Sequence, residues 1–252
     1  MNKVLEISDL DFSYHTLSGE TKAVSKISFD VYENEFLGII GPSGSGKSTI
    51  LSLIFGLLTP TAGQIRMHTK SGADETAIGY MLQKDHLFEW RTIYKNMTLG
   101  LEIKHQLTDG KKQLIEKMLH DYGLDAFRNA KPSQLSGGMR QRAALIRTLA
   151  LEPKMLLLDE PFSALDAQTR LSVSDDIYSI LRKEKKSAVL VTHDISEAIS
   201  FCDRVLVLTT RPGTVKKILP IRLSVDSKTP LKARSAPEFR QYFNELWGEL
   251  HG

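Results

Sequence analysis

The chain has 252 residues, of which 41% are hydrophobic and 25% are charged, a composition typical of a globular protein with a sizeable core. Its net charge of +3 comes from basic residues scattered among acidic ones, which argues against a nucleic-acid-binding surface. The longest apolar runs are too short to cross a bilayer, and the single cysteine, Cys202, excludes an internal disulfide and is expected to be a small buried residue.

The N-terminal region alternates apolar and polar residues. This alternation predicts a strand over residues 4–14 and a second one over residues 27–31. The opening sequence MNKVLEISDL lacks the apolar segment of a signal peptide, so we expect none. Tyr14 closes the first strand, where it is either a platform for stacking on a flat base or an ordinary packing residue.

The sequence GPSGSGKST at residues 41–49 fits the pattern of a phosphate-binding loop. An apolar run over 36–40 predicts a buried strand before it, and residues 50–58 predict a helix after it. In such a loop, backbone N–H groups and the positive end of the helix hold phosphate oxygens. Lys47 can reach the β- and γ-phosphates, and the Ser48 hydroxyl can bind Mg²⁺. The candidate nucleotide-binding residues are Gly41, Pro42, Ser43, Gly44, Ser45, Gly46, Lys47, Ser48 and Thr49.

Two further short strands are expected after the loop. A turn at 59–63 precedes a strand over 64–67, and a polar loop at 69–75 precedes a strand over 77–82 that ends at Gln83. The segment QKDHLFEWR follows, with Phe88 and Trp90 among charged residues. These aromatic residues are either part of the core or an exposed pair suited to docking a partner, and their spacing leaves both open.

Residues 92–124 have helical periodicity. One face of a helix is formed by Leu114, Ile115, Met118, Leu119 and Tyr122, and Asp109-Gly110 is expected to separate this helix from the one before it. Because this stretch interrupts an alternation of strands and helices, we expect an inserted helical subdomain over about residues 84–154.

The sequence LSGGMRQR at 135–142 opens another helix within this insert. Ser136 is expected to be its N-cap, and the helix is expected to run to about Ala150. Gly137 and Gly138 at the helix entry form a second place where backbone N–H groups can face an anion.

Two apolar runs predict parallel strands that are buried on both faces. Residues 155–158 end at Asp159 and Glu160, and residues 187–192 end at His193. Ligands of parallel sheets bind at the carboxyl ends of the strands, so Asp159 can hold Mg²⁺ and Glu160 can act as a general base. His193 is either a ligand-binding residue or a hydrogen-bonded residue that fixes the strand end.

The C-terminal part predicts strands over 204–208 and 215–219 and then a polar, linker-like segment at 221–237. An apolar stripe follows, and it predicts an amphipathic helix formed by Phe239, Tyr242, Phe243, Leu246, Trp247 and Leu250. This helix either packs on the body of the protein or docks a partner. We therefore divide the chain into a domain at 1–220 and a C-terminal linker and helix at 221–252.

The motifs GPSGSGKST, Gln83, LSGGMRQR, MLLLDEP, SALD and His193, in this order, closely resemble the ATPase subunits of ABC transporters over nearly the whole chain. LSGG at 135–138 is the discriminating motif. The resemblance implies an α/β fold: a P-loop NTPase core with a mainly parallel sheet, an N-terminal antiparallel β subdomain and the helical insert. FEWR at 88–91 and RPG at 211–213 resemble the nitrate, sulfonate and taurine importer branch, which usually has proline at the position of Glu89.

The resemblance also implies how ATP is held. Tyr14 would stack on adenine, and the loop at 41–49 would hold the phosphates and Mg²⁺. The ATP bound to one chain would be capped by a second copy through its Ser136, Gly137 and Gly138. Asp166 of the SALD motif would link the two subunits.

The residues for hydrolysis follow from the same resemblance. Gln83 would contact Mg²⁺ and the attacking water and would sense the membrane partner. Asp159 would support Mg²⁺, Glu160 would be the base and His193 would hold the γ-phosphate.

These roles imply an ATPase that pairs head to tail around two ATP molecules and powers a membrane permease seated over residues 83–91. We expect it on the cytoplasmic face of the membrane as a peripheral subunit, with an extracytoplasmic solute-binding protein as an indirect partner and no nucleic-acid partner. The alternative is an ABC ATPase that acts on nucleic acid or the ribosome. Such proteins typically carry two fused ATPase domains or a long coiled-coil insert, whereas this chain has one set of motifs and no sustained heptads.

Overall fold

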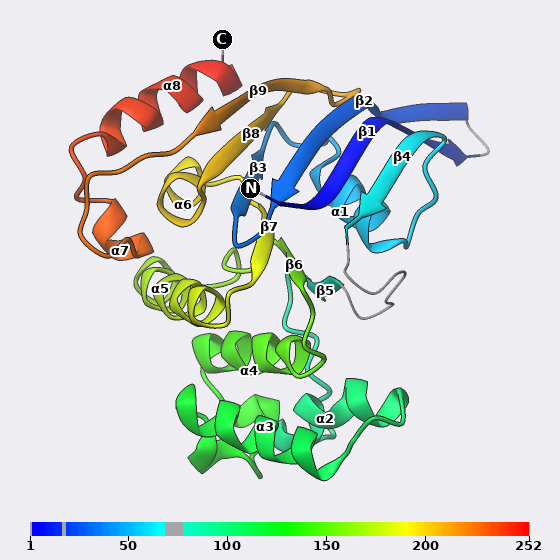
Figure 1. Ribbon diagram of the computed structural model, residues 1–252. Coiled ribbons are helices and arrows are strands. Elements are labelled where there is room, and N and C mark those ends of the chain that lie inside the picture. The colour runs from blue at the N-terminus through cyan, green and yellow to red at the C-terminus, as the bar shows by residue number, and fades with distance from the viewer. Residues whose placement is uncertain (1, 17–18, 69–77, 252) are drawn as a thin grey trace.

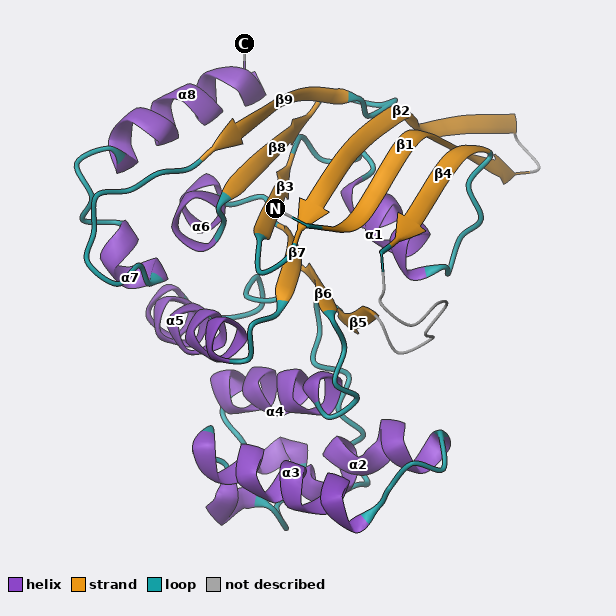
Figure 2. Ribbon diagram, in the orientation of Figure 1, coloured by secondary structure: helices purple, strands orange, loops and turns teal. Residues whose placement is uncertain are grey.

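The computed structural model describes residues 2–16, 19–68 and 78–251. Its strands form two sheets (Figures 1 and 2). The smaller sheet is antiparallel, with the order β2-β1-β4, and consists of β1 (Lys3–Thr16), β2 (Gly19–Tyr32) and β4 (Ala62–Met67). The polar loop expected at 69–75 lies outside the described residues.

The larger sheet has the order β5-β6-β7-β3-β8-β9. It is parallel except for its last strand, which runs antiparallel to its neighbour. Its strands are β3 (Phe36–Ile40), β5 (Ile78–Met81), β6 (Met155–Asp159), β7 (Ser187–Val191), β8 (Arg204–Leu208) and β9 (Val215–Pro220). The expected α/β fold with a mainly parallel sheet and an antiparallel N-terminal sheet is confirmed.

Both faces of the central strands are buried, as their continuous apolar sequences predict. In β6, Leu156 and Leu158 pack on the side of the later helices, among them α5 (Ala167–Lys183) and α6 (Ile195–Phe201). Met155 and Leu157 face the opposite cluster, which includes α1 and the antiparallel strands. The sheet is thus fixed from both sides, and the loops at its carboxyl edge rest on a rigid base.

Helix α1 (Lys47–Phe55) starts directly at the phosphate loop. The sequence pattern placed this helix at 50–58, but it begins three residues earlier and ends three residues earlier. Gly56 adopts a left-handed conformation with φ of 84° and stops the helix there.

The helical insert contains α2 (Ile93–Ile103), α3 (Asp109–Asp121) and α4 (Gly137–Leu149), which lie together below the sheets in Figure 1. Two short 3₁₀ helices, Asp125–Phe127 and Pro132–Gln134, connect α3 to α4. The expected separation of two helices is present, but the break lies at 104–108 and not at Asp109-Gly110, because both of these residues belong to α3. Thr108 caps that helix by accepting a hydrogen bond from the backbone N–H of Lys111 at 3.4 Å.

The C-terminal segment returns to the body of the protein. The stretch that resembled a linker contains α7 (Pro230–Ala233), which packs against α5 and α6. Helix α8 (Phe239–His251) buries Leu246, whereas Trp247 stays 52% exposed. Lys217 of β9 donates hydrogen bonds to the carboxylates of Glu245 (2.8 Å) and Glu249 (3.1 Å) on this helix. Of the two alternatives for this helix, packing on the rest of the protein is confirmed for the helix face that carries Leu246.

Cys202 is a free, buried cysteine, as expected from the sequence. Among the described residues, no helix combines the length and the hydropathy that a membrane span requires.

A buried carboxyl group lies at the junction of β7 and α6. The hydroxyl of Thr192 donates a hydrogen bond to Oε2 of Glu197, while Oε1 has no hydrogen-bond partner in the part of the chain that the structure describes. Asp194 caps α6 through the backbone N–H groups of Ser196 (2.8 Å) and Glu197 (3.2 Å). Burial raises the pKa of Glu197 to about 7, so the neutral carboxyl predominates only below that pH.

We expect this group to make folding pH-dependent. The ordinary pKa of the carboxyl is 4.5, so its stabilising contribution is complete below pH 4.5 and is lost as the pH rises through about 7. The loss amounts to roughly 3 kcal/mol, since one pKa unit corresponds to about 1.4 kcal/mol. Glu197→Gln should remove this pH-dependent loss of stability, so the variant should gain stability relative to the natural protein between pH 5 and 8. Urea titrations across this pH range measure the free energy of unfolding, and Glu20→Gln, at an exposed residue, is the control. Parallel pH profiles of the natural protein and Glu197→Gln would disprove the prediction.

Candidate active site

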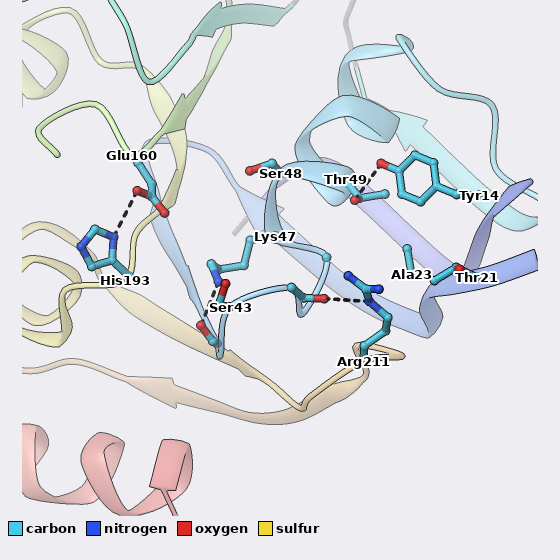
Figure 3. Close-up of a pocket in the computed structure, with 13 residues that line it drawn as sticks. Tyr14, Thr21, Ala23, Ser43, Lys47, Ser48, Thr49, Glu160, His193 and Arg211 are labelled. Carbon is cyan, nitrogen blue, oxygen red and sulfur yellow. Dashed lines mark hydrogen bonds and ion pairs between the residues drawn. The ribbon is translucent and has the colours of Figure 1, made fainter. Parts of the chain in front are cut away.

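A cavity of about 470 Å³ opens at the carboxyl edge of the parallel sheet, beside the antiparallel sheet (Figure 3). The strands that end here deliver the phosphate loop after β3, Glu160 after β6 and His193 after β7. The cavity is lined by Tyr14, Thr21, Ala23, Gly41, Ser43, Gly44, Gly46, Lys47, Ser48, Thr49, Glu160, His193 and Arg211. Most residues expected to bind nucleotide therefore meet in one place.

The phosphate loop needs its glycines. Gly44 and Gly46 have φ of 75° and 91°, values that side chains rarely allow. A Cβ on Gly46 would also lie 2.5 Å from Cγ1 of Val24. The Lys47 ammonium group donates hydrogen bonds to the carbonyls of Gly41 (2.8 Å) and Pro42 (2.9 Å), and burial lowers its pKa. The loop is thus compact and carries a partly desolvated cation at its centre.

Asp159 and Ser48 form the polar pair behind the loop. Oδ1 of Asp159 accepts a hydrogen bond from the Ser48 hydroxyl at 3.1 Å, and Oδ2 accepts one from Tyr80 at 3.3 Å. Burial raises the pKa of Asp159, and these two hydrogen bonds oppose that shift. Burial, followed by the charge of Asp159, raises the pKa of Tyr80 to about 12, so the phenol stays a donor.

This oxygen pair fits a magnesium ion that is bound together with phosphate. Mg²⁺ prefers oxygen ligands and usually takes one or two from the protein, with water and substrate phosphates completing the shell. In the ranges that the structure describes, no group of three or more His, Cys, Asp or Glu residues could hold a metal by itself. The hydroxyl of Ser48 and the carboxylate of Asp159, which lie 3.1 Å apart, could be two of the protein ligands of Mg²⁺.

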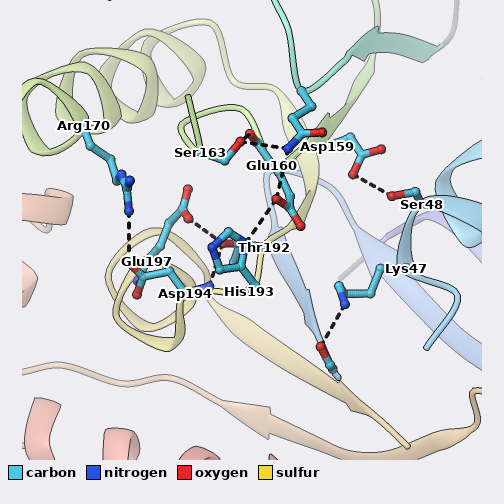
Figure 4. A network of polar contacts seen from close by, with 12 residues as sticks. Lys47, Ser48, Asp159, Glu160, Ser163, Arg170, Thr192, His193, Asp194 and Glu197 are labelled. Carbon is cyan, nitrogen blue, oxygen red and sulfur yellow. Dashed lines mark hydrogen bonds and ion pairs between the residues drawn. The ribbon is translucent and has the colours of Figure 1, made fainter. Parts of the chain in front are cut away.

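Glu160 points away from Asp159, toward His193 (Figure 4). Its backbone has φ of 45°, and its N–H donates to the carbonyl of Val191 at 2.9 Å. Oε2 of Glu160 lies 3.1 Å from Nδ1 of His193 and accepts a hydrogen bond from Nε2 of Gln83 at 3.4 Å. The three expected catalytic side chains are therefore in contact.

Tyr14 stands at the far end of the cavity from this cluster (Figure 3). Its hydroxyl is 3.1 Å from Oγ1 of Thr49, and its ring meets Phe12 edge to face with 4.9 Å between the ring centroids. The side chain stays 41% exposed. The ring is thus both packed and accessible, which leaves a face available for a base.

Several expected site residues do not line the cavity. Ser136 caps α4 through the N–H of Met139 at 3.3 Å, and Asp166 caps α5 through the N–H groups of Gln168 and Thr169 at 3.1 and 3.0 Å. Gly137 and Gly138 pack toward Leu165 and α5. The cavity is also not lined by Pro42, Ser45, Gln83 or Asp159.

Four residues at or beside the cavity are not among those expected from the sequence: Thr21, Ala23, Tyr80 and Arg211. Arg211 had a usable signal, because it follows the strand at 204–208 and the carboxyl ends of parallel strands share one edge. Thr21 and Ala23 had none, since only the packing of β2 beside the loop brings them there.

The ABC transporter family model matches residues 24–163, which is more than half of the chain. The uncharacterised ABC transporter ATP-binding protein YtlC of Bacillus subtilis is 43% identical over 98% of this chain and 95% of its own length. The nitrate import ATP-binding protein NrtD of Synechocystis sp. is 39% identical over 98% of this chain and 95% of its own length.

A solved structure, the dimeric ATP-binding cassette MJ0796 in a post-hydrolysis state with ADP and Pi, superimposes with a TM-score of 0.72. It is 30% identical in sequence and covers 86% of this chain and 99% of its own. Together with the phosphate loop and the LSGG motif, these relationships show that the chain belongs to the ABC transporter family, as an ATP-binding subunit that hydrolyses ATP.

Proposed function

We propose that this chain is the ATPase subunit of an importer, and that two copies close head to tail around two ATP molecules to drive a membrane permease. The observation that carries this proposal is the division of the expected site into two separate parts. The phosphate loop, Glu160 and His193 line one cavity, whereas Ser136, Gly137 and Gly138 lie outside it. A second copy that presents its LSGG motif would complete the site.

Dimerisation would make ATP the bridge between the subunits. The γ-phosphate would contact Lys47 and His193 of one chain and the LSGG helix entry of the other. The N-terminus of α4, with Ser136 as its cap, offers backbone N–H groups and the positive end of a helix to that phosphate. Asp166, exposed at the N-terminus of α5, would lie at the contact between the copies. The dimeric relative MJ0796 supports this arrangement.

In hydrolysis, Glu160 would accept a proton from the attacking water, and Gln83 would orient that water. Phosphoryl transfer depends mainly on positioning and on charge stabilisation. Both side chains already touch each other, and His193 holds the same Glu160 oxygen. Ser48, Asp159 and Gln83 would hold Mg²⁺, which supplies charge neutralisation on the phosphates when bound. Loss of the γ-phosphate would remove the bridging contacts and let the pair open.

The surface for the permease would be the segment at 83–91. Trp90 is 71% exposed, and its ring lies against Phe88 with 4.7 Å between centroids. Glu89 accepts a hydrogen bond from the backbone N–H of Ser133 at 3.1 Å, so an acidic residue has a structural role here. The segment begins at Gln83, which touches Glu160. A permease seated on these aromatic residues would therefore be connected to the catalytic carboxylate.

The solute would be a small anionic or organic compound of the nitrate, sulfonate or taurine type. NrtD carries nitrate import in its name, while the name of YtlC includes no solute. An extracytoplasmic binding protein would deliver the solute to the permease, with the ATPase at the cytoplasmic face of the membrane. The alternative partner, nucleic acid or the ribosome, is an outcome of the partner experiment below.

Glu160→Gln should almost abolish turnover and keep ATP binding. The amide cannot accept the proton, and general-base catalysis typically contributes about 10²–10⁴-fold. With ATP the variant should accumulate as a dimer on size-exclusion chromatography, and with ADP it should elute as a monomer. A monomer under both conditions would contradict the ATP-bridged pair.

Lys47→Ala should weaken ATP binding by roughly 10- to 100-fold, because a hydrogen bond from a charged group contributes about 1.5–3 kcal/mol. Isothermal titration with ATP measures this, and the exposed Lys26→Ala is the control. Unchanged affinity in the Lys47 variant would count against the assignment of the phosphate loop.

The partner is tested by purifying the tagged chain from its own cells in mild detergent and identifying co-purified proteins by mass spectrometry. We expect a multi-spanning membrane protein, and its identity would narrow the solute. Trp90→Ala should reduce its recovery, whereas Trp247→Ala, at the other tryptophan of the chain, should not. Ribosomal or DNA-bound partners without a membrane protein would overturn the transport role and leave the ATPase in place.

A further inference from the structure

The loop between β8 and β9, residues 209–214, packs between β2 and the phosphate loop. Gly213 donates its N–H to the carbonyl of Ala23 and accepts from the N–H of Ser25, both at 2.9 Å. A Cβ at Gly213 would lie only 2.0 Å from the carbonyl oxygen of Ser45. The contact is so close that the position of this loop relative to the phosphate loop is tightly constrained.

The position of this loop places Arg211 at the wall of the nucleotide cavity. Its Nε donates to the carbonyl of Gly44 at 3.3 Å, and Nη2 lies 3.2 Å from the point that a Cβ on Gly44 would occupy. No ion pair of Arg211 with a carboxylate occurs within 2–16, 19–68 and 78–251. The guanidinium group therefore keeps donors available for an anion in the cavity.

Its place along the cavity indicates which part of a nucleotide it meets. In Figure 3, Arg211 lies on the side of Thr21 and Ala23, whereas Glu160 and His193 lie on the opposite side, with Lys47 between. Tyr14, the expected base platform, is also on the side of Arg211. The arginine is thus remote from the carboxylate expected to activate water.

We propose that Arg211 is a nucleotide-binding residue that contacts the non-transferred phosphates, the ones that ATP and ADP share. This assignment rests on the proposed placement of ATP in this cavity. Arg211 adds a second cation to Lys47, on the side away from hydrolysis. Because ADP keeps these phosphates, the contact strengthens binding of both nucleotides to the same extent and does not favour the transition state.

The guanidinium geometry is part of the proposal. One N–H holds the side chain on the Gly44 carbonyl, and the planar guanidinium group has further N–H donors for an anion. A lysine has a single point charge and cannot make both contacts at once with the same geometry. Arg211→Lys should therefore recover only part of the affinity that Arg211→Ala loses.

The test is isothermal titration of the full chain with ATP and with ADP, together with steady-state ATPase kinetics. Arg211→Ala should weaken both nucleotides by a similar factor, roughly tenfold for a charged hydrogen bond at an accessible site. KM for ATP should rise by that factor, while kcat stays unchanged. Arg240→Ala, an exposed arginine on α8, is the control, and circular dichroism verifies that each variant is folded.

Unchanged affinity for both nucleotides would overturn the proposal, and so would a loss confined to ATP, which would place the arginine at the γ-phosphate. Titration of Lys47→Ala distinguishes a wrong role for Arg211 from a wrong assignment of the nucleotide site. If Lys47→Ala loses binding and Arg211→Ala does not, only the role of Arg211 fails. If neither variant loses binding, the nucleotide site itself is misplaced.

Discussion

The parallel pairing of β6, β7, β3 and β8 is the constraint on which the site depends. Their register brings the ends of four strands to one edge, and each end is followed by a residue or loop that lines the cavity. These strands can be apolar throughout because helices and the antiparallel sheet cover both faces. The polar groups at the carboxyl edge are therefore held by a sheet that cannot shift without disturbing the core.

Burial also determines the electrostatics of this edge. Lys47, Asp159 and Glu197 are all partly or largely removed from water, and in each the charged form is disfavoured. Specific partners offset part of this effect, namely the carbonyls near Lys47, the hydroxyls near Asp159 and the Thr192 hydroxyl at one oxygen of Glu197. Phosphates and a divalent cation would stabilise the charged forms of Lys47 and Asp159, so nucleotide binding and the folded arrangement of the edge support each other.

The two backbone connections at Glu160 and Gly213 show how the site is assembled from distant parts of the chain. The left-handed conformation of Glu160 turns its side chain to His193 while Asp159 turns to Ser48. Gly213 brings the β8–β9 loop against Ala23 and Ser45. Adjacent residues thus contact different partners, and Ala23 and Gly213, which are far apart in the sequence, are hydrogen-bonded to each other.

The sequence by itself determined the phosphate loop, the buried strands and the carboxylates at the end of β6, because these depend on local patterns with a fixed mechanism. It also predicted Ser136 as the N-cap of α4 and the α/β class of the fold. It misplaced α1 and the start of α3, where a left-handed Gly56 and the cap at Thr108 decide the ends. Only the tertiary structure decided that Thr21 and Ala23 line the cavity, that Tyr80 contacts Asp159 and that the LSGG motif lies outside the cavity of its own chain. Those facts depend on which strands are neighbours, and no local pattern contains that information.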